Sequence, residues 1–198
     1  MKLSWILVII LPLLLTMSVA AVQESAEDPA VARSLAILQS IVKAGNYSDT
    51  RNLIEQWIDI LEQEFGPEHP VILGALHTEG RIRFERGAYA DAASIFEQQV
   101  ELSKRIHGPE DPRTLEAMGW VAAMLHYAGN HSKARMLGES ILETQRRIIG
   151  ENHPDTLTTR NNLAETLRSQ GDLVGARQHH EQVLEERRRI LGAEHATP

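Results

Sequence analysis

Apolar and polar residues follow one another along this chain with the spacing of amphipathic helices, and the pattern returns at a fixed interval. Corresponding positions such as Gly66, Gly108 and Gly150 lie 42 residues apart. Within each interval the pattern predicts a pair of helices. The first helices are expected at residues 29–44, 70–86, 112–128 and 154–170, and their partners at 48–64, 89–107, 132–149 and 173–191.

Glycine and proline mark the predicted helix ends. Eight glycines fall into two columns with the same interval: Gly45, Gly87, Gly129 and Gly171, and Gly66, Gly108, Gly150 and Gly192. Glycine ends helices because it can adopt a left-handed conformation, whereas proline is tolerated in the first turn of the next helix. Pro70, Pro112 and Pro154 each follow such a glycine by four residues. A Gly-x-x-x-Pro hinge between repeats is therefore predicted.

The aligned repeats share apolar and small positions. One column reads Ile58, Val100, Leu142 and Leu184, and another reads Thr50, Ala92, Ala134 and Ala176. The first suits stacking between repeats, and the second allows two helices to approach closely. A single hairpin cannot bury its apolar stripe alone, so successive hairpins are expected to stack around a continuous core.

Three motifs carry a family resemblance: Gly-x-x-His-Pro-Asp-Thr-Leu at 150–157, Asn-Asn-Leu-Ala at 161–164 and Gly-Asp-Leu-x-x-Ala at 171–176. With their spacing they resemble the kinesin-light-chain type of tetratricopeptide repeat. The resemblance covers residues 29–192. It implies an all-α, right-handed solenoid of helical hairpins with about four repeats, at 29–66, 67–108, 109–150 and 151–192.

The N-terminal segment has the pattern of a signal peptide. Lys2 precedes an apolar run from residue 5 to residue 15, and small residues follow. We expect residues 1–21 to direct export, with cleavage after Ala20 or Ala21.

An uncleaved anchor is the alternative, because residues 3–22 reach about the minimum length of ~20 residues for a membrane-spanning helix. Residues 23–28 are polar and lack periodicity, and residues 22–28 are interpreted as a linker. The rest of the chain is predicted to be secreted or periplasmic, or membrane-anchored and facing outside.

The C-terminal residues 193–198 look like the start of an incomplete repeat. Solenoids usually finish with a polar capping helix, but Val183, Leu184, Ile190 and Leu191 are apolar. We therefore expect an uncapped C-terminal edge, covered by a second copy, by a partner or by sequence beyond this chain.

The composition and charge of the chain exclude several kinds of functional site. The chain has no cysteine, which excludes disulfides, thiolate metal sites and cysteine nucleophiles. The formal net charge is −7, and loss of residues 1–21 removes only the positive charge of Lys2, which gives −8. Without a basic stripe, such an acidic chain is not expected to bind nucleic acid.

The resemblance implies a ligand groove lined by the first helices. Carried over column by column, the candidate partner-binding residues are His77, Arg81, Phe84, His126, Tyr127, Asn161, Asn162, Glu165 and Arg168. The groove is expected to be apolar at one end and polar at the other. Arginine could clamp a carboxylate through two parallel hydrogen bonds.

Several of these residues also fit a structural role. Relatives of this type hold peptide backbones with repeated asparagines, since an amide both donates and accepts. Only the fourth repeat has this pair, so Asn162 is equally compatible with a structural role. His126 and Tyr127 could stack on a ligand or pack in the core, and Phe84 fits the core better. Exposed arginines are often simply solvated.

No catalytic or cofactor site is predicted. His69, His153 and His195 recur in the hinge position, which Asp111 occupies in the third repeat, and this favours helix capping over metal binding. No His-Glu-x-x-His motif or phosphate-binding loop occurs. We therefore expect a non-enzymatic, exported scaffold that binds a protein or peptide in its groove, without cofactor or metal. The alternative is a self-assembling unit, or a fragment of a larger repeat protein, that uses the C-terminal edge.

Overall fold

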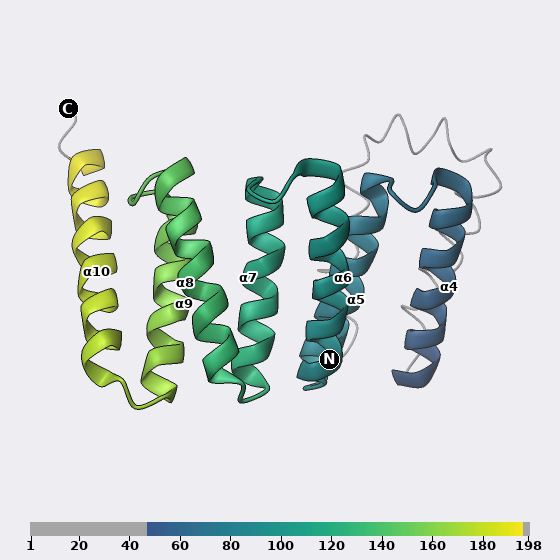
Figure 1. Ribbon diagram of the computed structural model, residues 1–198, viewed down its shortest axis with the longest axis horizontal. Coiled ribbons are helices and arrows are strands. Elements are labelled where there is room, and N and C mark those ends of the chain that lie inside the picture. The colour runs from purple at the N-terminus through teal and green to yellow at the C-terminus, as the bar shows by residue number, and fades with distance from the viewer. Residues whose placement is uncertain (1–46, 196–198) are drawn as a thin grey trace. The chain divides into compact units, whose positions relative to one another are not determined.

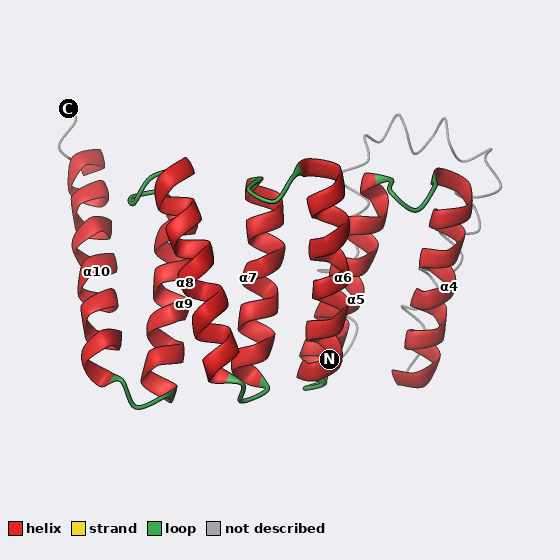
Figure 2. Ribbon diagram, in the orientation of Figure 1, coloured by secondary structure: helices red, strands yellow, loops and turns green. Residues whose placement is uncertain are grey.

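The computed structural model describes residues 47–195. The chain divides into two compact units, Met1–Ile82 and Arg83–Pro198, which are described separately. Every regular element of the described residues is a helix (Figure 2). The predicted leader, the linker and the helix expected at 29–44 lie outside these residues.

The first unit contains α4 (Tyr47–Phe65) and most of α5 (Pro70–Glu85), whose last three residues belong to the second unit. Both helices bury one apolar side. The buried apolar side chains are Ile54, Trp57 and Leu61 on α4 and Ile72, Ala75 and Leu76 on α5, and α5 also buries the polar Thr78 and Glu79.

The second unit contains α6 (Tyr89–His107), α7 (Pro112–Tyr127), α8 (His131–Ile148), α9 (Pro154–Ser169) and α10 (Leu173–His195). Each helix packs against the next along the chain (Figure 1). First helices also meet one another, since α7 contacts α9. This confirms the predicted succession of stacked hairpins.

The helix ends agree with the predicted ends to within one residue, with one exception. The helix expected to end at Leu191 continues through Gly192 to His195. Glycine tolerates helical dihedrals as well as left-handed ones, and Ala193 and Glu194 behind it favour helix. The predicted helix end at Leu191 was therefore wrong.

The hinge glycines adopt the conformation for which only glycine is well suited. Gly66, Gly108 and Gly150 have φ of 87°, 98° and 91°, and Gly87, Gly129 and Gly171 of the other column are also left-handed. A side chain at any of these positions would be strained. The turns themselves therefore require glycine at these six positions.

Capping explains the hinge histidines His69 and His153. The side chains of Asp111 and His153 accept from the backbone N–H two residues later, at 2.9 Å from Arg113 N and 3.2 Å from Asp155 N. His69 does the same for Val71 N at 3.3 Å. Because the first N–H groups of a helix lack partners within it, these bonds satisfy otherwise free donors. The predicted capping role is confirmed for His69 and His153.

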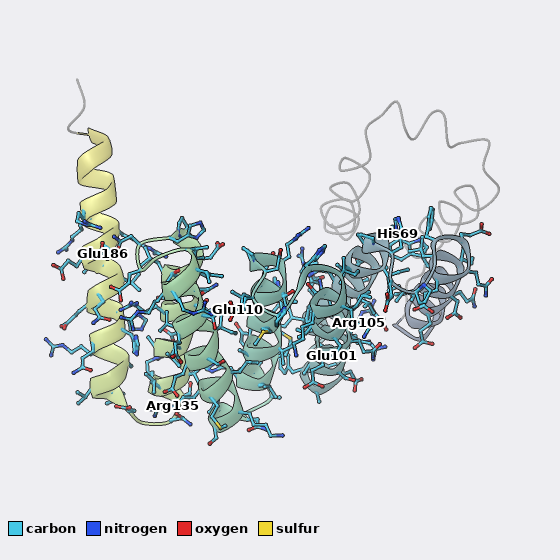
Figure 3. All side chains as sticks on the ribbon, turned by 45° about the horizontal axis from the view of Figure 1, so that its top comes forward. His69, Glu101, Arg105, Glu110, Arg135 and Glu186 are labelled. Atoms are coloured by element: carbon cyan, nitrogen blue, oxygen red, sulfur yellow. The ribbon has the colours of Figure 1, made fainter. Side chains whose placement is uncertain are left out.

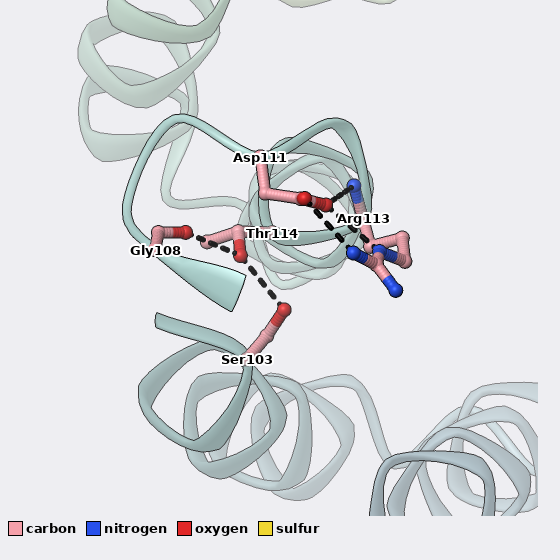
Figure 4. Close-up of polar contacts among 5 residues, drawn as sticks. All are labelled: Ser103, Gly108, Asp111, Arg113 and Thr114. Atoms are coloured by element: carbon pink, nitrogen blue, oxygen red, sulfur yellow. Dashed lines mark hydrogen bonds and ion pairs between the residues drawn. The ribbon is translucent and has the colours of Figure 1, made fainter. Parts of the chain in front are cut away.

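A buried threonine closes each of the last two hinges. Thr114 donates from Oγ1 to the carbonyl oxygen of Gly108 at 2.9 Å and lies 2.7 Å from Ser103 Oγ, which joins α6 to α7 (Figure 4). Thr156 bonds in the same way to Gly150 at 2.8 Å. Both threonines are fully buried. The hinge thus fixes how one hairpin follows the next.

The apolar columns form the core of the second unit. Val100 and Leu142 are 7% and 6% exposed, and Ala92, Ala134 and Ala176 are buried. Leu184, the last member of the stacking column, is 49% exposed. The column therefore predicts burial correctly only where another helix follows.

Charged side chains project from the helix surfaces, for example Arg135 on α8 (Figure 3). Arg135 pairs with Glu139 at 2.8 Å on the same helix. No helix of residues 47–195 is both long and apolar enough to cross a membrane.

Candidate functional site

A concavity of about 550 Å³ lies over α8, between α7 and α9. Phe84, at the end of α5, also lines it. Its floor on α8 consists of Ala134, Gly138 and Ile141, all buried. Gly138 keeps this floor low and leaves space above it for the side chains of the two walls.

The α7 wall is mainly apolar and aromatic. Trp120 stacks on Phe96 of the core, with ring centroids 5.4 Å apart and planes at 17°. Tyr127 stacks on Tyr89 at 5.4 Å and contacts Phe84 at 5.3 Å, yet it is 53% exposed. Neighbouring rings therefore hold Tyr127 in place while one surface of it stays accessible.

The α9 wall is polar. It presents Thr159, Asn162, Glu165 and Arg168 to the concavity. Arg168 donates from Nη2 and Nε to Glu165 Oε2, at 2.6 and 3.0 Å. Their side chains are 63% and 41% exposed, so water screens this pair and rearrangement to contact a ligand would cost little.

One polar contact joins the two walls. Thr166 Oγ1 lies 3.2 Å from His126 Nδ1, and Thr166 also bonds to the backbone oxygen of Asn162 at 3.0 Å. Burial lowers the pKa of His126 below its usual value, and the neighbouring His131 lowers it further. A neutral His126 ring held by Thr166 therefore ties α7 to α9 at the base of the concavity.

Six of the nine predicted residues line this concavity: Phe84, His126, Tyr127, Asn162, Glu165 and Arg168. Asn161 does not line it, although it is only partly buried. On α9 the lining row runs through Thr159, Asn162 and Thr166. His77 and Arg81 belong to the first unit, and their position relative to this site is not described.

Sequence reasoning missed part of the lining. Trp120, Thr159 and Thr166 contribute to the concavity but were not among the candidates. The signal that could have found Trp120 is its residue type, because a tryptophan on a first helix offers a large contact area.

A separate, more polar hollow of about 450 Å³ lies between α8, α9 and α10. Arg160 is 7% exposed there; it donates to Gln182 and lies 3.9 Å from Glu151. Burial followed by the charge of Arg160 lowers the pKa of the adjacent His179. Since a buried charge is costly without partners, this network joins the last two hairpins. No group of three His, Asp or Glu side chains in the described part of the chain could hold a metal ion.

Three solved structures share this arrangement of helices, and at identities of 20–21% they show the fold alone. A kinesin-light-chain candidate of Podosopora anserina with nearly identical TPR-like repeats superposes with a TM-score of 0.68 at 21% identity, covering 86% of this chain and 84% of that one. Its Q17M variant gives 0.69 at 21%, covering 87% and 84%. BtubC (BKLC) from P. vanneervenii gives 0.66 at 20%, covering 84% and 68%.

Comparison with curated protein sequences gave no match. The tetratricopeptide repeat family, in contrast, matches residues 72–139 and 113–189, which together span more than half of the chain. The matched residues include every helix that lines the concavity between α7 and α9. The chain therefore belongs to the tetratricopeptide repeat family.

Proposed function

We propose that this protein is an exported scaffold that holds a protein or peptide in the concavity between α7 and α9. Repeats of this family are typical scaffolds of protein–protein interaction. The observation that carries the proposal is the pairing of an aromatic wall on α7 with a polar wall on α9, across about 550 Å³.

The aromatic wall suits apolar side chains of a ligand. Tyr127 offers an exposed ring that Phe84 and Tyr89 already support. Such a ring gives a large contact area with little further loss of side-chain freedom. A flexible partner would then bear most of the ordering cost.

The polar wall suits a peptide backbone. The amide of Asn162 can donate to a carbonyl and accept from an N–H, and the hydroxyl of Thr159 can do the same. Arg168 and Glu165 add one charge of each sign. The contact of Thr166 with His126 keeps the two walls in register before a ligand arrives.

Export is a separate part of the proposal and depends on residues 1–21. Lys2 and the apolar run behind it support a cleaved signal peptide. Mass spectrometry of the N-terminus after production in an exporting host tests this. A mature chain that begins at Ala21 or Val22 supports cleavage, whereas an intact N-terminus in the membrane fraction indicates an anchor.

Binding is tested by affinity capture from the host's envelope and medium. The triple variant Tyr127→Ala, Asn162→Ala, Arg168→Ala is compared with the native chain. Met136→Ala is the control, because Met136 is 71% exposed and lines neither the concavity nor the polar hollow. A partner that the native chain and the control retain, and that the folded triple variant loses, supports the proposal. Equal capture by all three proteins refutes it.

A further inference from the structure

The outer face of α10 continues the stacking columns of α6 and α8, but no further helix covers it among residues 47–195. Val100 on α6 and Leu142 on α8 are buried, because α7 and α9 follow them. Leu184, at the same place on α10, is 49% exposed. Val183, in contrast, is buried and belongs to the core.

This face holds a shallow, largely apolar hollow of about 360 Å³. Leu173, which is 65% exposed, lies at one end of it and Leu184 at the other. Between them lie Arg177 and Glu181, joined by a bond of 2.6 Å from Nε to Oε1. Their side chains are 78% and 59% exposed.

These four residues form one stripe, because positions 173, 177, 181 and 184 follow the three-and-four spacing of a single helix face. Along the stripe the order is apolar, positive, negative, apolar. If a second identical stripe runs in the opposite direction, the apolar ends meet and each charge meets its opposite. The stripe is therefore complementary to itself.

We propose that α10 pairs with α10 of a second copy of this chain, antiparallel about a twofold axis. Leu173 then packs near Leu184 of the second copy, and Arg177 faces Glu181 of the second copy. A twofold contact uses the same patch on both chains and closes after two. A parallel pairing would place like charges opposite one another, which is destabilising.

The aligned positions on α6 and α10 argue against a head-to-tail assembly of copies. In such an assembly, an apolar first helix of the next copy would dock on α10. The residues that face the next helix are Phe96, Val100 and Ser103 on α6, and their counterparts on α10 are His180, Leu184 and Arg187. Two of the three have become basic, so the surface that α10 would offer to an apolar helix is only partly apolar.

The dimer is expected to be weak, because a contact between two single helices lies at or below the small end of specific interfaces, about 1,200 Å² in total. Exposed ion pairs add little, so the leucines supply most of the affinity and the charges select the orientation. Sedimentation velocity of the full chain, as recovered from an exporting host, measures association between about 1 and 300 μM, a range matched to weak, transient complexes.

Leu184→Glu should raise the dimer dissociation constant by about tenfold or more, because it places a charge in the apolar contact. Met136→Glu is the matched control and should associate like the native chain, since this exposed residue of α8 lies outside the stripe. Circular dichroism checks that both variants are folded. A native chain that stays monomeric at the highest concentration, or one that forms species larger than a dimer, would overturn the proposal.

Charge reversal tests the orientation. Arg177→Glu alone and Glu181→Arg alone each place like charges across the twofold axis and should weaken self-association. Mixed in equal amounts, the two variants should form a one-to-one dimer, because both cross-chain pairs are then opposite in sign. The double variant should also dimerise. If the mixture associates no better than either variant alone, the antiparallel pairing is wrong.

Discussion

The concavity over α8 and the hollow over α10 occupy equivalent places in the repeat, yet they differ in what bounds them. The first has two walls, α7 and α9, and measures about 550 Å³. The second has one neighbouring first helix among the described residues, α9, and measures about 360 Å³. Equivalent positions of the repeat thus form a groove with two walls over α8 and an open face over α10.

The residues of the two helices reflect this difference. Gly138, Leu142 and Gln145 face α9 from α8 and are buried. At the equivalent positions α10 has His180, Leu184 and Arg187, of which none is buried. A column therefore determines which way a residue faces, and the next helix determines whether it is core or surface. The predictions below test that distinction, in order of decreasing effect.

Phe96→Ala should have the largest effect. Phe96 is fully buried on α6 and stacks on Trp120, so its loss should lower the free energy of unfolding by about 3–5 kcal/mol. His180→Ala, at the equivalent position of α10, should change it by less than about 0.5 kcal/mol. Urea denaturation measures both. Similar losses of unfolding free energy for the two variants would contradict the distinction between the covered α6 and the open face of α10.

Leu142→Ala and Leu184→Ala form a closer pair, because both change leucine in one column. The first should cost about 2–5 kcal/mol, as it leaves a cavity between α8 and α9. The second should cost no more than about 0.5 kcal/mol in the monomer. If Leu184→Ala destabilises a dilute sample as strongly as Leu142→Ala, then another part of the chain covers α10.

Thr114→Val removes a buried hydroxyl that links the α6–α7 hinge. It leaves the Gly108 carbonyl and Ser103 without this partner, so the free energy of unfolding should fall by about 1–3 kcal/mol. Thr158→Val is the control, because the exposed Thr158 bonds only within its own helix, to Pro154. Thermal or urea unfolding should show little change for the control; an equal loss would mean that the hinge bond adds nothing.

Asp111→Ala should lower the free energy of unfolding less than Thr114→Val does, because it removes only the partly exposed N-cap of α7. The hydrogen bond from the Arg113 side chain, followed by that from its backbone, lowers the pKa of Asp111 to about 2. A depressed pKa means that the cap stabilises the fold above the ordinary titration range of aspartate and loses its effect as the pH falls through about 2. Unfolding measured at pH 7, with Glu143→Ala as the exposed control, tests the cap.

Acidification should weaken the α7–α9 contact slightly. Because the pKa of His126 is lowered in the folded protein, the unfolded chain binds the proton more readily, and stability is lost as the pH falls below about 6.5. His126→Gln should reduce the difference in unfolding free energy between pH 7.5 and pH 5. His179→Gln should reduce it too, since burial also lowers the pKa of His179. If both variants show the same difference in unfolding free energy between pH 7.5 and pH 5 as the native chain, this account is contradicted.

Much of the fold could be predicted because its signals are local. Glycine columns, prolines and the spacing of apolar residues determine helix ends within a few positions, and the hinge histidines act as caps as expected. The bonds of Thr114 and Thr156 were missed because threonine is compatible with many roles. The helix end at Leu191 was predicted wrongly because a glycine inside a helix and a glycine that ends a helix cannot be told apart from the sequence alone.

The candidate site was harder to predict, because it depends on helix rotation. Asn161 and Asn162 are adjacent in sequence but point about 100° apart on a helix, and only Asn162 lines the concavity. The aromatic support of Tyr127 comes from Tyr89 and Phe84, which lie on other helices. Such contacts between side chains of different helices follow from packing, and the repeat spacing of the sequence does not predict them.

Binding in the concavity between α7 and α9 is tested most directly by site-specific crosslinking. The chain has no cysteine, so Asn162→Cys and Met136→Cys each accept a single photoreactive label, one inside the concavity and one outside it. Each labelled chain is illuminated in the host's envelope fraction. We predict that the label at 162 captures a discrete protein or peptide and that the label at 136 captures none. Adding Tyr127→Ala to the chain labelled at 162 should reduce the yield of the crosslinked product. The same products from both positions, or none from 162, would contradict a groove-binding scaffold.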